Sequence, residues 1–223
     1  MMRKDLPRNV WAGQALYTPF FLHMYNWFAL GLDCRFIWGC PTKHINKLYD
    51  KYVSGNHLDI GVGTGYFLEK CIFPITKPRL VLVDLNPNSL VLAQKRLVRY
   101  HPQVYRRNVL EPLNLNIDTF GFDSIGMTHL LHCLPGNMRT KGIVFQYVKS
   151  LLNPGGILFG TTLLYKGVKR NPLATFLFWW TNIFGFMTNK QDGLEGLEEH
   201  LRAHFSESHI EVIGCEALFW ARK

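Results

Sequence analysis

The feature that most constrains the fold is a glycine-rich turn that directly follows a short apolar run. Residues 57–66 read His-Leu-Asp-Ile-Gly-Val-Gly-Thr-Gly-Tyr, with an acid, Asp59, followed by three glycines at alternate positions. Glycine lets the backbone turn tightly and lets a ligand approach without a Cβ in the way. This segment therefore predicts a strand, a ligand-binding loop and a helix that begins at Tyr66.

A second acid ends the next predicted strand after this turn. Asp84 ends the next apolar run, whose residues Leu80 to Val83 are typical of a strand that is buried on both faces. A carboxylate at the end of that strand can accept hydrogen bonds from a ribose diol. Together the turn and Asp84 favour a fold that binds a nucleotide-like ligand.

Strand and helix patterns alternate along the rest of the chain. Strands are predicted at 56–60, 79–84, 103–106, 122–128 and 157–164, and helices at 66–72, 88–100 and 138–152. This alternation indicates a parallel sheet covered by helices on both faces. Right-handed crossovers then bring the carboxyl ends of the strands to one edge, where ligands bind.

The last part of the chain follows a different pattern. The apolar runs at 209–213 and 217–221 are separated by only three residues, too few for a parallel crossover, so they must form an antiparallel hairpin. The predicted fold is α/β, with a doubly wound, mostly parallel seven-stranded sheet that ends in an antiparallel hairpin. One domain is expected over 1–223, with a helical cap segment at 1–50 and a Rossmann-like core at 51–223.

Composition excludes several other classes of protein. A chain of 223 residues that is 48% hydrophobic and 18% charged suits one globular domain with a sizeable core. Its net charge is +9, but the basic residues are dispersed, so a nucleic-acid surface is not favoured. The five cysteines form no CxxC pair, which argues against a disulfide framework or structural zinc and for a cytoplasmic location. No His, Asp or Glu cluster has metal-ligand spacing, so no metal is expected.

The stretch from Ala15 to Leu32 lacks charged residues and approaches the length of a membrane span. It also contains Pro19, His23 and Asn26, and no convincing cleavage site follows it. We expect an amphipathic or buried helix that packs on the domain, rather than a spanning helix or a signal peptide. Peripheral contact with a membrane stays open as an alternative.

Local features separate two classes of cofactor. A carboxylate at Asp59, two residues before the first glycine, would repel a pyrophosphate but suits a ligand that carries an ammonium and a sulfonium group. The glycine spacing is G-x-G-x-G, and the hairpin ending is not usual for a dinucleotide dehydrogenase. These features favour S-adenosylmethionine (SAM) over a nicotinamide cofactor.

Three motifs resemble those of the class I SAM-dependent methyltransferases. Asp59 to Gly65 is similar to their motif I, Asp84-Leu85-Asn86-Pro87 to the acidic motif after their second strand, and Leu151 to Gly156 to the loop before their fifth strand. The resemblance covers about Tyr49 to Lys223. It is specific for the superfamily and not for a substrate.

The resemblance implies SAM as cofactor, with S-adenosylhomocysteine (SAH) as product, and it implies roles for residues at the strand ends. The methionine part would be held by Asp59 and by the turn that contains Gly61, Gly63 and Gly65. Ribose and adenine would be held by Asp84, Leu85, Asn108 and Val109, although Asn108 stands where the family usually has an acid. Residues after the fourth strand would line the cofactor and acceptor pocket, namely Thr128, His129 and Leu130.

Methyl transfer from a sulfonium is a direct displacement, so the enzyme must align the acceptor and exclude water. A base helps if the acceptor is a hydroxyl or an ammonium group. His132 and His129 follow the fourth strand and are the predicted candidates for this base. The alternative for each is a cofactor contact or a packed core residue.

Aromatic residues indicate where the acceptor binds. Tyr25 and Trp38 in the N-terminal segment, and Trp179 in the aromatic run at 176–180, are predicted to contact it. An apolar or aromatic small molecule would suit these residues. The same aromatic run is also consistent with a dimer face or a membrane-touching surface, and both a monomer and a homodimer stay open.

The sequence therefore predicts SAM-dependent methyl transfer to a small, apolar or aromatic acceptor. Another SAM-consuming reaction, such as intramolecular cyclisation, and a catalytically silent binding subunit use the same cofactor motifs and stay open. A nucleic-acid amino-methyltransferase is not favoured, because residues 128–135 lack an Asn/Asp-Pro-Pro-aromatic motif.

Overall fold

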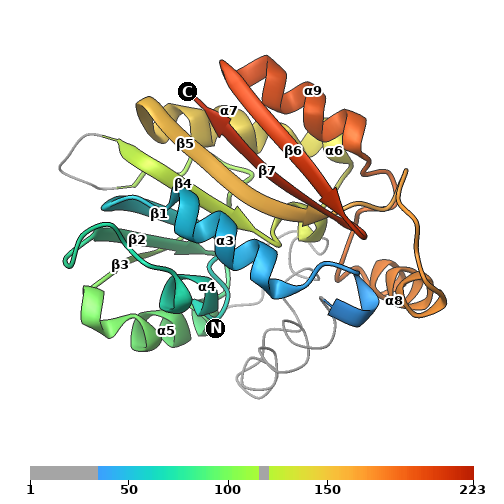
Figure 1. Cartoon of the computed structure of the whole chain (residues 1–223), viewed down its shortest axis with the longest axis horizontal. Helices are drawn as coiled ribbons and strands as arrows, with labels where there is room; N and C mark the ends of the chain where they lie inside the picture. Colours follow the sequence, from blue (N-terminus) through green and yellow to red (C-terminus); the bar gives the residue numbers. More distant parts are fainter. Residues whose placement is uncertain (1–34, 116–120) are drawn as a thin grey trace.

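The computed structural model describes residues 35–115 and 121–223. Its centre is one seven-stranded sheet, whose strands lie in the order β3-β2-β1-β4-β5-β7-β6 (Figure 1). The strands are β1 (Asn56–Ile60), β2 (Arg79–Asp84), β3 (Gln103–Arg106), β4 (Phe122–Thr128), β5 (Leu152–Leu163), β6 (Glu207–Ile213) and β7 (Glu216–Arg222).

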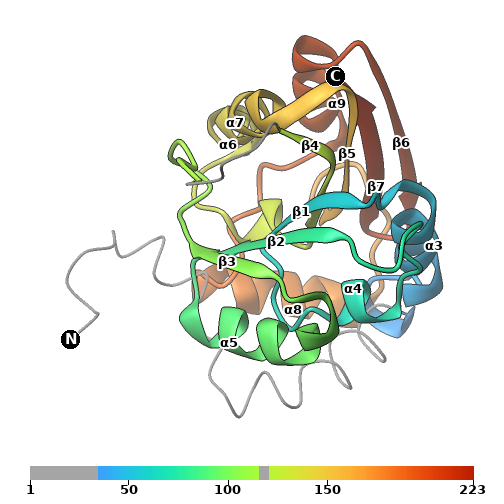
Figure 2. The ribbon, with the colours of Figure 1, turned by 90° about the vertical axis from the view of Figure 1, so that its left-hand side faces the viewer.

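Helices cover both faces of this sheet (Figure 2). One face carries α3 (Thr42–Tyr52), α4 (Tyr66–Lys70) and α5 (Pro87–Arg96), and the other carries α6 (Met138–Lys141), α7 (Ile143–Leu151) and α9 (Leu194–His204). Each layer has its own buried apolar cluster against the sheet. The remaining helix, α8 (Pro172–Ile183), packs through Phe178 against Leu163 at the end of β5 and Cys215 before β7.

The strand directions confirm the predicted fold class. The pairs β3·β2, β2·β1, β1·β4 and β4·β5 are parallel, whereas β7 pairs antiparallel with both β5 and β6. The order of strands reverses at β1, since β2 lies on one side of it and β4 on the other. In such sheets the crevice at the carboxyl ends of these strands is where ligands bind.

The first four predicted strands agree with the structure to the residue. The fifth begins at Leu152 instead of Ile157, because Leu152 already pairs with Phe122 through an irregular register. Residues 153–156 read as a turn in sequence, yet they continue the strand.

The predicted helix boundaries differ more from the structure than the strand boundaries do. The helix expected at 66–72 ends at Lys70, and the one expected at 88–100 ends at Arg96 and is followed by a 3₁₀ turn, η2 (Val98–Tyr100). The helix expected at 138–152 divides at Gly142 into α6 and α7. A Cβ at Gly142 would lie 1.9 Å from the His200 ring of α9, so only glycine permits this close packing.

The predicted apolar segment from Ala15 to Leu32 lies outside the described residues. Within residues 35–115 and 121–223, no helix is long and apolar enough to cross a membrane.

Candidate active site

Two adjoining pockets open at the carboxyl edge of the sheet and share Gly61, Gly63 and His129. The first encloses about 700 Å³ of space, including space open to solvent, and its lining includes Asp84 and Leu85. The second encloses about 480 Å³ on the same basis and is lined in part by Asp59, Thr64, Tyr66 and Thr128. The two pockets form one cleft around the glycine-rich turn.

The glycine turn needs its glycines for three different reasons. Gly61, Gly63 and Gly65 all have positive φ, at +73°, +53° and +72°. Gly61 lies under Leu130, and Gly65 lets α4 approach Ala93 of α5. At Gly63 a Cβ would meet nothing closer than the Gly61 carbonyl oxygen at 4.0 Å, so its absence leaves space open in both pockets.

Asp84 is fixed at the end of β2 by two backbone donors. Its Oδ1 accepts the N–H of Asn86 at 2.8 Å, and its Oδ2 accepts the N–H of Gly63 at 3.1 Å. Burial raises the pKa of Asp84 to about 6, although these two hydrogen bonds lower it. A carboxylate held this way keeps further lone pairs for a ligand hydroxyl.

Asp59 lies at the end of β1 and is almost fully buried. The Tyr49 hydroxyl, from α3, donates to Asp59 Oδ2 at 2.9 Å, and His57 Nε2 lies 3.5 Å from the same oxygen. Burial, followed by the charge of Asp59, raises the pKa of Tyr49 well above its usual value. On the neighbouring strand a Cβ at Gly126 would lie 2.6 Å from Asp59 Oδ2, so glycine there makes room for the carboxylate.

The predicted adenine-side residues Leu85, Asn108 and Val109 all line the first pocket. The Asn108 side chain is engaged within its own loop. Its amide oxygen accepts the N–H of Leu110 at 3.1 Å, and its amide nitrogen donates to Glu111 at 2.9 Å. Its amide oxygen therefore keeps only one lone pair for a ligand.

Residues at the end of β4 bring the two pockets together. Thr128 lines the second pocket, Leu130 the first, and the His129 ring lines both. His129 has a φ of +56°, and its backbone N–H donates to Thr161 O at 3.0 Å. Its Nε2 lies 2.5 Å from Oε1 of Glu216 on β7.

His132 lies behind His129, in the 3₁₀ turn η3 (Leu131–Cys133), with ring centroids 5.8 Å apart. It is buried, and its Nδ1 accepts the N–H of Leu163 at 3.1 Å. Burial, with smaller contributions from His129 and Lys141, holds the pKa of His132 well below its usual value. It lines neither pocket, so its position is that of a packed residue.

The aromatic residues predicted to bind the acceptor do not meet at this cleft. Trp38 is buried against Phe178 of α8, at 4.7 Å between ring centroids. Its carbonyl also accepts the N–H of Cys215, which anchors Trp38 to the β6–β7 turn. Trp179 is 53% exposed on α8. Neither lines the two pockets, and Tyr25 lies outside the described residues.

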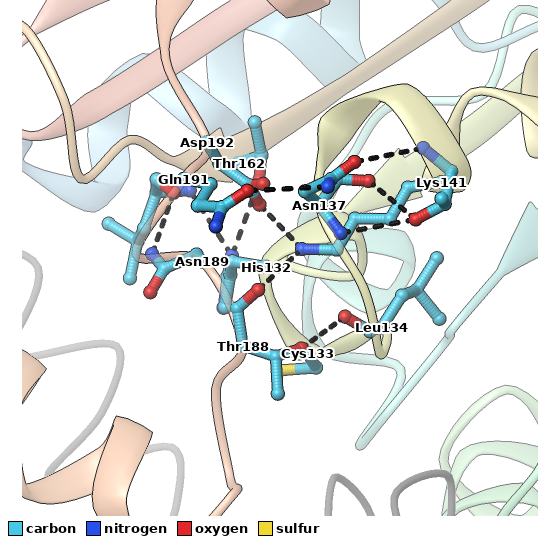
Figure 3. A network of polar contacts seen from close by, with 12 residues as sticks. His132, Cys133, Leu134, Asn137, Lys141, Thr162, Thr188, Asn189, Gln191 and Asp192 are labelled. Atoms are coloured by element: carbon cyan, nitrogen blue, oxygen red, sulfur yellow. Dashed lines mark hydrogen bonds and ion pairs between the residues drawn. The ribbon is translucent and has the colours of Figure 1, made fainter.

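A buried ion pair joins the segment between α8 and α9 to Lys141, the last residue of α6 (Figure 3). Lys141 Nζ lies 2.5 Å from Asp192 Oδ2, and both side chains are fully buried. The same ammonium donates to Thr188 O at 3.0 Å, and Thr188 N–H donates to His132 O at 2.9 Å. Burial lowers the pKa of Lys141 and raises that of Asp192, while their mutual attraction opposes both changes.

Sequence reasoning missed Tyr49, Glu216 and the pair formed by Lys141 and Asp192. Each of these meets its partner only through tertiary folding, and no local motif marks it. His57 is two residues before Asp59 in the same predicted strand, so the sequence alone could have indicated that the two side chains lie close together.

Comparison with known proteins gives consistent matches. Residues 58–158 match the family described as a methyltransferase domain. The chain is 37% identical over 216 residues to the demethylluteothin O-methyltransferase of Streptomyces thioluteus, which covers 97% of this chain and 93% of that protein. It is 39% identical over 212 residues to the physcion biosynthesis cluster O-methyltransferase of Aspergillus chevalieri, with 95% of each chain covered.

Solved structures share the fold at much lower sequence identity. The complex of DhpI with SAH matches with a TM-score of 0.64, at 14% identity and with 96% of each chain covered. The N-methyltransferase NodS of Bradyrhizobium japonicum, solved with SAH, matches with a TM-score of 0.56 at 20% identity, covering 82% of this chain and 87% of that one. At this level of identity the likeness concerns the fold alone.

Proposed function

The chain belongs to the SAM-dependent methyltransferases, and from that premise we propose that it methylates a hydroxyl group of a small aromatic or apolar molecule. The observation that carries the proposal is the cleft at the strand-order reversal, in which the glycine turn and Asp84 lie together. Cyclisation of SAM and a silent binding subunit are not favoured, because the relatives that match nearly the whole chain bear the names of O-methyltransferases.

The cleft fits SAM by three features. Open space at Gly63 leaves room for a ligand against the backbone, where any side chain would project into it. Asp84 offers charge-assisted acceptor sites for the ribose hydroxyls, and Asp59 offers a negative charge beside the glycine turn for the ammonium and sulfonium end. When bound, SAM supplies an activated methyl group that needs only an aligned nucleophile.

Further roles follow from the lining of each pocket. Leu85 and Val109 would contact the two faces of the adenine ring, and Asn108 would meet its edge. Thr128 and Leu130 would close the cleft around the methionine part and the sugar, respectively. His129 lines both pockets and is our candidate for the group that takes the acceptor proton, while His132 supports it from behind.

The acceptor is a hydroxyl-bearing natural product in this proposal, since the names of the two relatives specify O-methylation. A further relative, 34% identical over 188 residues, is the N-methyltransferase vrtF of Penicillium aethiopicum, so amines belong in any test. We propose a cytoplasmic enzyme, because Cys40, Cys71, Cys133 and Cys215 are all free thiols.

Calorimetric titration with SAM, SAH and NAD in parallel tests the cofactor. Binding of both adenosyl ligands in the micromolar range, with no NAD signal, is expected. Binding of NAD alone would overturn the proposal. Incubation with methyl-labelled SAM and a panel of phenols, aliphatic alcohols and amines then tests the acceptor class. Label transfer to amines but to no hydroxyl would refute O-methylation.

A further inference from the structure

We propose that Glu216 is a positioning residue for His129, and that the two form the proton-accepting pair of the methyl transfer. This inference rests on the proposed function. It adds a residue from the C-terminal hairpin, far along the chain, to the chemistry of the cleft.

The first support is the burial of the Glu216 carboxylate. The side chain has no exposed surface, and among the described residues it forms one ion pair, with His129. Burying a carboxylate is costly unless a positive or hydrogen-bonding group compensates it. The Cys40 thiol also faces this carboxylate. Burial and then the charge of Glu216 raise the pKa of Cys40 well above its usual value.

The second support is the orientation of the His129 ring. Nε2 is the shielded nitrogen and lies 2.5 Å from Oε1 of Glu216, whereas the side chain as a whole keeps 14% of its surface exposed. The Nε2–H direction is bent away from Oε1, so the two atoms lie close together without an aligned hydrogen bond, and the contact becomes an ion pair once the ring takes up a proton. A hydrogen on Nε2 leaves the lone pair on Nδ1, the nitrogen on the exposed side of the ring.

The third support is the backbone of His129. Its φ of +56° lies in the left-handed region, which residues with a side chain rarely adopt and which strains the backbone. The hydrogen bond to Thr161 O holds this conformation, in which His129 lines both pockets and its Nε2 lies beside Glu216. Strain of this kind at a pocket wall is typical of functional positions.

The proton and electron balance of the step is complete. The acceptor hydroxyl gives its proton to Nδ1 of His129, and an oxygen lone pair forms the new O–CH₃ bond. The C–S bond breaks and its electrons stay on sulfur. Glu216 then faces an imidazolium and stabilises it by opposite charge, until the proton leaves to solvent.

Glu216→Gln removes the charge while keeping the volume, and Glu216→Asp keeps the charge. With a phenol that is un-ionised at the assay pH, the Gln variant should lose about 10²-fold in kcat, and the Asp variant should recover part of it. SAM affinity by calorimetry should stay within about twofold of wild type, since Glu216 lines neither pocket. Glu211→Gln, on exposed β6 of the same hairpin, is the matched control and should match wild type.

The acidity of the acceptor separates this role from a structural one. With a ring-substituted phenol that is already ionised at the assay pH, no base is needed, so the loss in the Gln variant should nearly vanish. An equal loss with both phenols would overturn the proposal, because damage to the fold does not depend on acceptor acidity.

One measurement needs no methyl acceptor, so it tests the pair of Glu216 and His129 independently of the proposed function. Nitrogen NMR of histidine-labelled protein with SAH shows which ring nitrogen of His129 carries the hydrogen, and the signal is assigned by its loss in His129→Gln. In wild type the hydrogen should lie on Nε2, the nitrogen beside the Glu216 carboxylate, and in Glu216→Gln it should be divided between Nε2 and Nδ1. The other titratable groups near this pair, His132, Cys40 and Cys215, are retained in the variant.

Three outcomes are then distinct. An unchanged hydrogen position refutes the pair, whatever the acceptor panel shows. A changed position with no methylated acceptor supports the pair and refutes the proposed function. If the Gln variant does not fold, the Asp variant is measured in the same two assays, and a hydrogen position and kcat near wild type support the role of the carboxylate.

Discussion

At the scale of single residues, a substitution at Gly63 most directly tests where SAM binds. Gly63→Ala adds a methyl group to open space in the cleft. Overpacking of this kind costs about 1–3 kcal/mol, or roughly ten- to hundredfold in SAM affinity. Gly155→Ala is a matched control, since Gly155 has a φ of +75° and nothing within 4 Å of its Cβ position. Both variants should lose similar stability by urea unfolding, and equal SAM affinity in both would place the ligand elsewhere.

The charge of Asp84 predicts a pH dependence of SAM binding. Its pKa of about 6 in the folded protein means that the carboxylate is ionised above pH 6 and protonated below it. SAM affinity should therefore fall roughly tenfold between pH 7.5 and pH 5, because the protonated group loses its charge-assisted bonds to the ribose. Calorimetry at a series of pH values measures this. Asp84→Asn should bind weakly at every pH, and a flat wild-type profile would contradict the assignment.

Residues within the glycine-turn motif could be predicted because their partners are local. The acid, the three glycines and the strand that ends at Asp84 form a pattern whose geometry follows from backbone sterics. Tyr49 and Glu216 could not be found this way. Tyr49 reaches Asp59 from a preceding helix, and Glu216 reaches His129 only once β7 has paired with β5.

At the scale of elements, the buried pair of Lys141 and Asp192 joins the α8–α9 segment to α6, and the hydrogen bond from Thr188 to His132 joins it to η3 after β4. Asp192→Ala leaves a buried ammonium without its carboxylate, which should cost about 3–5 kcal/mol in the free energy of unfolding. The exposed i,i+4 pair of Glu198 and Arg202 is the control, and Glu198→Ala should cost about 0.5 kcal/mol or less. Urea unfolding of both variants gives the comparison. Equal losses would mean that the buried pair adds no more stability than the exposed pair.

Helix boundaries were predicted less well than strand boundaries, and the reasons are physical. Strand β2 is an apolar run that ends at an acid, and β1 ends at the glycine turn, so their ends are visible in the sequence. The helix divides at Gly142, and the space over this glycine is filled by the His200 ring of α9, a contact between distant segments that no local pattern shows. The stretch at 153–156 carries turn residues, and the structure keeps it within β5 as an irregularity between the pairs Leu152–Phe122 and Ile157–Ser124.

At the scale of the whole molecule, the strand order predicts where the fold opens first. β1, β4 and β5 are paired on both sides, whereas β3 and β6 are the edges and their side chains are half-buried or exposed. Amide hydrogen exchange should therefore be slowest in β1, β4 and β5, and should approach the protection of global unfolding there. Exchange in β3 and β6 should be measurably faster by mass spectrometry of peptides. Equal protection throughout would indicate that the sheet opens only as one unit.

The insertion of β7 between β5 and β6 has a consequence for a chain that is still being made. As the polypeptide leaves the ribosome, β6 emerges first, but its place in the sheet exists only after β7 has paired with β5. The glycine turn, Asp84 and His129 can assemble early, on strands that are already complete. Glu216 arrives with the last strand, so a nascent chain gains its cofactor cleft before it gains its proposed proton-accepting pair.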